Sequence, residues 1–522
     1  MKNPINNNTY FNLIQPKIFN LLQYHISEDD PVRKLSAILV DMDFTKLLKV
    51  FSYKTKVHPV RMFAIILYAY SRGIYSTRDI ENACLENIKF RFLLQDSTLP
   101  DHSTISRFLN KIEHLLPDLF EQFIKKIFKM EDISTDNIYI DGTKIEAYAN
   151  RYSFVWKKSV KNYWNKLNDK IQALVLDFNQ EFNSNLSSFF EIYHYLENLN
   201  INFVHGRGKR KSKEQKYFEL CAEYLERYEK YSKHFQNLKE RNSYSKTDPD
   251  ATFMRMKEDA MLNGQLKPAY NIQHGVDSEY ITWLTIGPQP TDTTTLIPFL
   301  KDAQEHLKFK YKNITADAGY ESEENYLFIE GNGQTAYIKP QNYEISKTRK
   351  YKKDISRREN MEYHADRDSY ICRNGRELTV TNERRSKTAS GSVSVKTYYR
   401  SPDCTGCPYK TECIKGNNCK TPMEKRNKVL MVSKTMSQKR AEDLERITSE
   451  YGTMLRMNRS IQAEGSFADV KEDMNFRRYL YRGKANALAE SILLAMGRNI
   501  NKLHCKIQTG RTGSHLFSLK TA

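Results

Sequence analysis

Three acidic residues stand in contexts that could bring carboxylates together for metal-dependent chemistry. Asp141 in NIYIDGTKIEAYAN and Asp317 in KNITADAGYESEENY each follow a short run of β-forming residues, and Glu464 in RSIQAEGSFADVKED lies on a helical pattern. Carboxylates from separate elements can converge on hard cations such as Mg²⁺, which keep positions open for water and phosphate. Because a pair of such ions can bind the attacking and leaving oxygens of a phosphodiester, the three residues predict phosphoryl transfer.

Each of these residues also has an ordinary interpretation when it is considered alone. An Asp that follows an apolar strand and precedes a Gly is typical of a turn, which applies to Asp141 and equally to Asp317 in ADAGY. A Glu on an amphipathic helix is typical of a solvated face, which applies to Glu464. The joint pattern favours chemistry over three unrelated surface residues.

Around these residues the sequence resembles the DDE transposases of bacterial insertion sequences, from about residue 35 to about residue 505. The most specific pieces are IDGTKIEA, TADAGY and the segment from Arg456 to Leu503. The resemblance implies a ribonuclease-H-like catalytic domain with Asp141 on the first strand, Asp317 after the fourth strand and Glu464 on a late helix. It further implies that these three hold two Mg²⁺ or Mn²⁺ ions.

The same resemblance places a catalytic lysine seven residues after the glutamate, where this chain has Lys471. Seven residues are two helical turns, so both side chains would share a face, and Lys471 would contact a phosphate near the scissile bond. The family's Tyr-x2-Arg-x3-Glu spacing appears here as Arg456-x2-Arg459-x4-Glu464, so the Tyr is replaced and Arg459 is one residue out of register. Glu490 is a rival third carboxylate, but it lacks the lysine two turns on.

The pattern of elements predicts a mixed α/β (α+β) fold in which a ribonuclease-H-like core follows an all-α N-terminal domain. The core begins with a strand at 137–148, continues with strands at 269–277 and 280–288 joined by the turn Asp277-Ser278-Glu279, and adds a helix capped by Asp292 and the strands NITAD and QTAYIKP. The expected boundaries are a flexible arm at 1–30, a helical DNA-binding domain at 31–132, the catalytic domain at 133–505 and a flexible basic tail at 506–522.

Two insertions are expected to interrupt the core. The first, about 157–262, is helical and rich in aromatic residues, with a basic linker at 205–213 in its middle. It ends near Asp248 and Asp250 in TDPDAT, which could be mistaken for catalytic carboxylates, although the Pro between them indicates a turn. The second, about 341–451, is β-rich and contains the cysteine group.

The cysteines follow the spacing Cys404-x2-Cys407-x5-Cys413-x5-Cys419, with Cys372 upstream. This spacing resembles the knuckles of structural zinc sites, and a reducing cytoplasm disfavours disulfides. We predict a possible Zn²⁺ site made by Cys372, Cys404, Cys407 and Cys413, since Cys419 sits in a Gly-Asn-Asn loop. The alternative is that these cysteines bind no metal, because a second CxxC pair is missing.

The chain carries a net charge of +19, which indicates a polyanionic partner, although a generally basic protein is the alternative. Its Lys and Arg residues gather in runs that contain Tyr, as in TRKYKK and KTYYR, and such runs suit phosphate tracking and base stacking. In the N-terminal helices, Ser103, Thr104, Ser106 and Arg107 lie where a helix-turn-helix could read DNA ends. A helical bundle that only packs or dimerises remains the alternative for this region.

The longest apolar runs, MFAIILYAY and ILLAMG, fall well short of the roughly 20 residues that cross a bilayer. The first ten residues, MKNPINNNTY, lack the apolar core of a signal peptide. We expect a cytoplasmic, nucleoid-associated protein with no membrane partner.

Together these features predict a transposase that binds the terminal inverted repeats of an insertion sequence and catalyses metal-dependent DNA cleavage and strand transfer. Its partners would be double-stranded DNA, both transposon ends and target, and a second copy of the chain in a homodimer on DNA. Two alternatives use the same features: a non-transposing metal-dependent DNA nuclease, and a DNA-binding regulator derived from a transposase.

Overall fold

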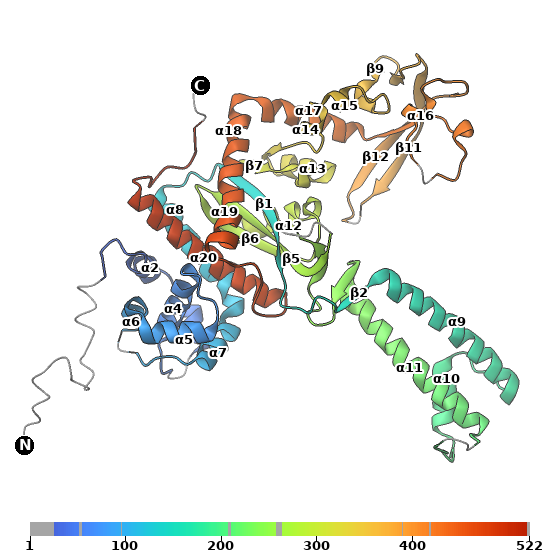
Figure 1. Ribbon diagram of the computed structural model, residues 1–522, viewed down its shortest axis with the longest axis horizontal. Helices are drawn as coiled ribbons and strands as arrows, with labels where there is room; N and C mark the ends of the chain where they lie inside the picture. The colour runs from blue at the N-terminus through green and yellow to red at the C-terminus, as the bar shows by residue number, and fades with distance from the viewer. Residues whose placement is uncertain are drawn as a thin grey trace, which may run out of the picture.

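The computed structural model describes residues 26–51, 55–95, 97–206, 210–256, 264–388, 390–416 and 419–518. These residues form a mixed α+β fold in which long helices surround and extend from β-sheets (Figure 1). The described residues exclude 1–25, which belong to the expected arm, and 207–209, which belong to the expected basic linker. Ile26 is already buried in the hydrophobic core.

The described residues before the first strand form helices. The most buried of them, α4, begins at Pro59 and ends at Ser71; its C-cap Arg72 directly precedes Gly73, which has φ +72°. Proline at the start and glycine past the end are the usual helix boundaries. The helices of this region are α2 Pro31–Val40, α3 Thr45–Val50, α4 Pro59–Ser71, α5 Thr77–Glu86, α6 Ile88–Leu94, α7 His102–Ile112, η2 Glu113–Leu115 and α8 Leu116–Glu131.

A central sheet follows, and its strands are those that the apolar runs predict. β5 and β6 form a hairpin through Ser278 and Glu279, whose φ angles of 55° and 71° give the turn that two-residue hairpins favour. A further short strand, β4, pairs with the start of β5. The sheet consists of β1 Asn137–Glu146, β4 Thr252–Arg255, β5 Leu266–Asp277, β6 Tyr280–Gly287, β7 Asn313–Ala316 and β8 Thr335–Ile338.

The strand directions match the expected core. β1 is antiparallel to β5, β5 is antiparallel to β6, and β1, β7 and β8 run parallel in that order. The connections to β7 and β8 contain η3 Asp292–Thr294, α12 Leu296–Leu307, η4 Ala318–Tyr320 and α13 Glu323–Gly331. This arrangement is compatible with a ribonuclease-H-like core.

The long helix α20, Lys484–Gln508, joins the sheet to the N-terminal helices. Asn499 exchanges two hydrogen bonds with the backbone of Ile281 in β6, at 2.9 and 2.8 Å. On its other side α20 packs so closely on α4 that a Cβ at Gly497 would lie 2.8 Å from the backbone nitrogen of Ser71. One hydrophobic core therefore spans the N-terminal helices and the sheet.

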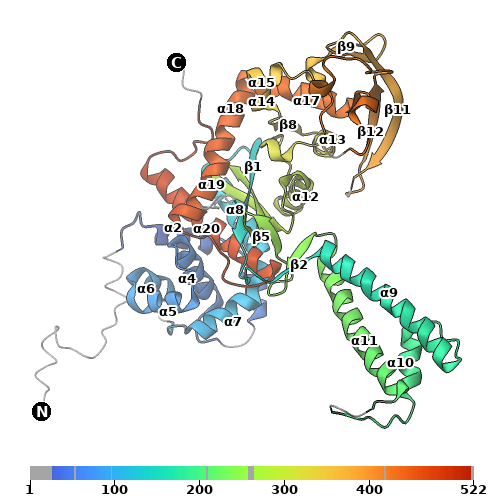
Figure 2. The same ribbon diagram turned by 45° about the vertical axis from the view of Figure 1, so that its right-hand side comes forward.

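The first insertion is a helical hairpin that projects from the sheet in both views (Figures 1 and 2). Its base is a two-stranded ribbon, β2 Phe154–Trp156 and β3 Ser243–Ser245. A separate core of mainly aromatic and aliphatic side chains holds its helices together. These helices are α9 Lys157–Phe182, α10 Phe189–Glu197 and α11 Lys213–Leu238.

The second insertion contains its own antiparallel sheet in the order β13-β12-β11-β10-β9. A small cluster around Leu378 and Tyr399 forms its core. The elements are α14 Tyr343–Ser346, α15 Arg349–Lys352, η5 Arg358–Asn360, β9 Glu362–His364, β10 Ser369–Ile371, β11 Glu377–Lys387, β12 Val393–Arg400, α16 Lys410–Cys413, η6 Met423–Lys425, β13 Val429–Val432 and α17 Lys434–Thr448.

The chain then returns to the central sheet through a helix with two π-helical turns. The segments are α18 Glu450–Arg459, the π-helical η7 Ser460–Glu464, α19 Gly465–Ala468 and the π-helical η8 Asp469–Asp473. Where the sequence led us to expect a flexible tail from residue 506, α20 continues to Gln508 and the next residues fold back. Phe517 exchanges two hydrogen bonds of 2.9 Å with the Asn458 side chain in α18.

Candidate carboxylate site

The structure puts Asp141 and Asp317 on neighbouring parallel strands. Ile140 of β1 pairs with Ala316 of β7, and the two aspartates are the residues that follow this pair. Adjacent strands are about 5 Å apart, so the two carboxylates start from neighbouring positions. Asp141 is buried, whereas Asp317 is partly exposed at the end of its strand.

Asp141 and Gly142 lie within β1, which continues to Glu146, so the turn interpretation of this Asp-Gly pair is wrong. The glycine is required by packing from the opposite strand. A Cβ at Gly142 would lie 2.6 Å from Nε2 of Gln273 and 2.8 Å from Oδ1 of Asp292. Asp292 accepts hydrogen bonds from Asn271 at 2.7 Å and from Gln273 at 3.2 Å, so a polar cluster fills the space beside the glycine.

This polar cluster supports the turn that carries Asp317. The Asp317 side chain accepts a 2.9 Å hydrogen bond from the backbone N–H of Gly319, and Thr293, next to Asp292, donates to the Gly319 carbonyl at 3.0 Å. The Tyr320 hydroxyl donates to Gln273. Burial, followed by the charges of Asp292, Asp141 and Asp317, raises the pKa of Tyr320 well above its usual value, so this hydroxyl stays protonated.

Glu464 lies at the end of the π-helical turn, with its side chain 52% exposed. A π-helix brings residues five apart onto one face, in contrast to the three- and four-residue spacing of an α-helix. Arg459 Nη2 therefore reaches Glu464 Oε1 at 2.7 Å. The extra residue that put Arg459 out of register in the sequence is absorbed by this turn.

Arg459 also faces the first strand. Its Nη1 lies 3.8 Å from Oδ1 of Asp141, and its side chain is only 13% exposed. The arginine thus contacts two of the three predicted carboxylates, one from β1 and one from the late helix. From the sequence, Arg459 is one residue out of register with the family spacing. The π-helical turn, which sequence periodicity does not reveal, accounts for the difference.

Lys471 is buried on the same helix, at the second π-helical turn. Its Nζ donates a 2.8 Å hydrogen bond to Oγ1 of Thr143, two residues beyond Asp141 on the same face of β1. The lysine is therefore brought to the strand that carries the first carboxylate.

Neutral packing holds the helix against β1 and β5 between Glu464 and Lys471. His274, which pairs with Asp141 across the strands, stacks on Phe467 at 4.1 Å and bonds to Ser466 at 3.1 Å. Burial, and then the nearby Arg498, lowers the pKa of His274 to about 3, so the ring is uncharged. This contact fixes the helix face without adding a charge beside the carboxylates.

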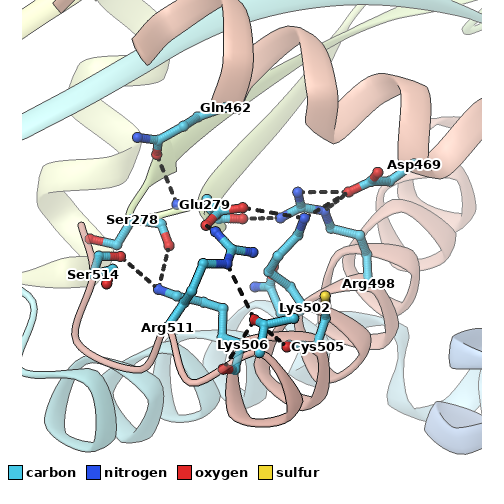
Figure 3. A network of polar contacts seen from close by, with 12 residues as sticks. Ser278, Glu279, Gln462, Asp469, Arg498, Lys502, Cys505, Lys506, Arg511 and Ser514 are labelled. Carbon is cyan, nitrogen blue, oxygen red and sulfur yellow. Dashed lines mark hydrogen bonds and ion pairs between the residues drawn. The ribbon is translucent and has the colours of Figure 1, made fainter. Parts of the chain in front are cut away.

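A polar network anchors the same helix on its other side (Figure 3). Gln462 accepts from the backbone N–H of Glu279 at 2.8 Å, and Asp469 accepts from Arg498 of α20 at 2.8 Å. Lys502 contacts the carboxylates of both Glu279, at 3.4 Å, and Asp469, at 3.8 Å. The helix that carries Glu464 and Lys471 is thereby tied to the β5–β6 turn and to α20.

The rival carboxylates have other partners. Glu490 is buried in α20 and accepts from the backbone N–H groups of Leu480 and Tyr481, each at 2.9 Å. Burial raises its pKa to about 8. Asp248 lies in a turn and accepts from the Tyr270 hydroxyl at 2.9 Å. Both residues therefore hold local structure.

The four predicted zinc ligands all belong to the second insertion. Cys413 and Cys404 are buried, and Cys372 and Cys407 are partly exposed. The pKa of the Cys413 thiol is raised, chiefly by burial; Lys428 opposes the rise, and Cys372, Cys404 and Cys407 add to it. Cys419 is exposed. Residues 417–418, directly before Cys419, lie outside the described residues.

Within the part of the chain that the structure describes, no group of three or more His, Cys, Asp or Glu side chains is already arranged to hold a metal ion. This applies to the cysteines and to the carboxylates alike. Among the same residues, no helix combines the length and apolar character needed to cross a membrane.

Two family models match this chain. A model described as a transposase DDE domain matches residues 371–504, which include Glu464 and Lys471, and a model described as a transposase domain (DUF772) matches residues 20–111 in the N-terminal helices. No curated protein matches. Asp141 and Asp317 lie outside both matched segments.

Proposed function

We propose that this chain, which the two domain matches identify as an insertion-sequence DDE transposase, cuts and joins DNA with a site built from Asp141, Asp317 and Glu464. The observation that carries the proposal is Arg459, which contacts Asp141 and Glu464 and so ties the late helix to the first strand. The strand order β6-β5-β1-β7-β8, with its antiparallel and parallel halves, supports a ribonuclease-H-like core around it.

The donor set fits divalent cations of the Mg²⁺ type. All three residues offer carboxylate oxygens, Asp141 and Asp317 start from adjacent strands, and the half-exposed Glu464 side chain is linked to Asp141 through Arg459. Two bound Mg²⁺ or Mn²⁺ ions would supply activation of water or of a DNA 3′-hydroxyl, and charge stabilisation of the leaving oxygen.

The residues around the carboxylates perform the remaining tasks. Lys471, held at Thr143, would place a point charge against a phosphate next to the scissile bond. Arg459 would balance the negative charge of Asp141 and Glu464 and could contact the same strand of DNA. The His274–Phe467 stack keeps the helix on the sheet during these steps.

DNA recognition by the N-terminal helices belongs to the same proposal. Ser103 and Arg107 are exposed on α7, and Thr104 and Ser106 are partly exposed beside them. The side chain of Asp101 caps this helix through the Thr104 N–H at 2.7 Å. One polar face of α7 is thus presented for reading the ends of the element, with a homodimer pairing the two ends.

The decisive experiment separates a transposase from a nuclease and from a DNA-binding regulator. Purified protein is given Mg²⁺ and DNA from the two flanks of its own gene, either intact or pre-cut to expose the 3′-hydroxyl, and products are mapped by sequencing. A transposase nicks at the ends and joins pre-cut ends to a target plasmid. Nicking without joining would identify a nuclease, and binding without either reaction would identify a regulator.

We also propose a structural Zn²⁺ ion for the cysteine cluster. Zinc is bound by thiolates in structural sites, and the influence of Cys372, Cys404 and Cys407 on the pKa of Cys413 supports a shared site. Protein purified without chelators should contain about one zinc per chain by metal analysis. Cys404→Ser should lower that content and the Tm, whereas Cys419→Ser is the matched control. Equal zinc content in both variants would refute the site.

A further inference from the structure

A basic cleft lies directly beside the carboxylates, on the side of β8. Lys339 follows Ile338, which pairs with Ala316 as Ala316 pairs with Ile140. Asp141, Asp317 and Lys339 are therefore the next residues on three adjacent parallel strands. The Lys339 N–H also donates to the Ala316 carbonyl at 3.3 Å. The carboxyl ends of parallel strands are where ligands of α/β sheets gather.

The cleft has a volume of about 380 Å³ and reaches from this row to the late helix. Glu464, Arg459, Lys339 and Arg456 are among its lining residues. Three of these four side chains are cationic. The surplus of positive charge is the opposite of what a second metal site would need.

One aromatic ring lies next to the two outer cations of the cleft, Lys339 and Arg456. Lys339, Lys347 and Arg456 lie over the ring of Tyr343, at 5.6, 3.8 and 5.3 Å from its centroid. Glu344 bridges the two lysines at 2.7 and 3.3 Å, which together lower its pKa. The Glu344 carboxylate therefore pairs with two of the three cations, and the ring keeps all three close despite their mutual repulsion.

Arg456 is held in a defined orientation. Its Nε donates to the Ile447 carbonyl at 2.9 Å, and its Nη2 donates to Thr453 at 3.2 Å. Arg456 stands three residues before Arg459, so both guanidinium groups project from one side of α18 into the cleft. A guanidinium fixed in this way suits the geometry of phosphate oxygens.

We propose that this cleft, lined by Lys339 and Arg456, whose charged groups lie over the ring of Tyr343, is a phosphodiester subsite that binds the DNA backbone next to the phosphate at the carboxylates. The inference rests on the proposed function, because it takes DNA as the substrate. In this role the cleft positions the DNA strand, and DNA binding in the cleft requires no metal ion.

The test measures DNA binding in EDTA, so that the carboxylate site contributes no metal-dependent contact. A fluorescein-labelled duplex of 30 base pairs and arbitrary sequence is titrated with protein at several salt concentrations. The double variant Lys339→Gln/Arg456→Gln is compared with Lys308→Gln/Lys312→Gln, which removes the same charge from exposed lysines before β7 begins, at the end of the strand away from Asp317.

Each phosphate contact contributes about 0.9 to the slope of log affinity against log salt, so the cleft variant should lose about 2 from this slope while the control keeps the wild-type value. Lys339→Arg/Arg456→Lys should keep the slope, and Lys339→Gln alone, with a native Tm, should lose about 1. Equal slopes for the cleft variant and the control would overturn the subsite alone. A wild-type protein without salt-dependent DNA binding would overturn the proposed function itself.

Discussion

The substitution Glu490→Gln separates a carboxylate that stabilises the fold from Glu464, the carboxylate assigned to chemistry. Glu490 is 2% exposed, and its pKa is raised from 4.5 to about 8, chiefly by burial. The group is protonated in the folded chain and ionised in the unfolded chain between these values. Its contribution to stability is therefore fully present below pH 4.5 and is lost as the pH rises through 8.

The size of the effect follows from the shift. One pKa unit corresponds to about 1.4 kcal/mol, so Glu490 should make the free energy of unfolding fall by roughly 4 kcal/mol between pH 5 and pH 8. Glutamine cannot ionise, but it offers a single carbonyl to the N–H groups of Leu480 and Tyr481 and leaves one of them unsatisfied, at a cost of about 1–3 kcal/mol at every pH.

Thermal unfolding of wild type and Glu490→Gln across this pH range is the assay. The variant should melt below wild type at pH 5, and the difference in Tm should shrink or reverse by pH 8.5, because only wild type loses the contribution of Glu490. Other buried acids such as Asp277 and Asp443 are common to both proteins, so their effects cancel in the comparison. A constant difference in Tm would refute the buried, uncharged carboxyl. Loss of cleavage in Glu490→Gln with cleavage kept in Glu464→Gln would move the third carboxylate to α20.

Two further substitutions test the support of the site. Gly142→Ala should lower stability by about 1–3 kcal/mol and reduce cleavage, because its Cβ would meet Gln273 and Asp292 at under 3 Å; an unchanged Tm in scanning calorimetry would refute this packing. Lys471→Met should lower the rate of DNA cleavage at least about 100-fold while leaving Mn²⁺ affinity in a titration unchanged. Normal single-turnover cleavage by that variant would remove the lysine from the reaction.

Much of the central sheet was predictable from the sequence because its signals are local. The apolar runs before Asp141 and Asp317 specify β1 and β7, and the turn between Asp277 and Tyr280 specifies the β5–β6 hairpin. The positions of Asp141 and Asp317 follow from these strands, because each residue comes directly after the paired residues Ile140 and Ala316. Where neighbouring residues decide the conformation, the sequence alone was sufficient.

The remaining features depend on contacts between distant segments. The π-helical turn that aligns Arg459 with Glu464 is stabilised by the tertiary anchors of Gln462 and Asn458, and helical periodicity alone does not reveal it. Gly142 is set by side chains that arrive from β5 and from the loop at Asp292. The local sequence therefore predicted a turn at the Asp141-Gly142 pair, because these distant contacts are not visible in it.

The central claim is that Asp141, Asp317 and Glu464 together carry the metal-dependent reaction. The most direct measurement is Mg²⁺-dependent nicking of a plasmid that contains the flanks of the gene, with wild type and with Asp141→Asn, Asp317→Asn and Glu464→Gln compared at matched DNA occupancy. We predict that each substitution abolishes nicking while Tm and DNA binding in EDTA stay close to those of wild type. Ordinary nicking by any one of the three variants would contradict the claim for that residue.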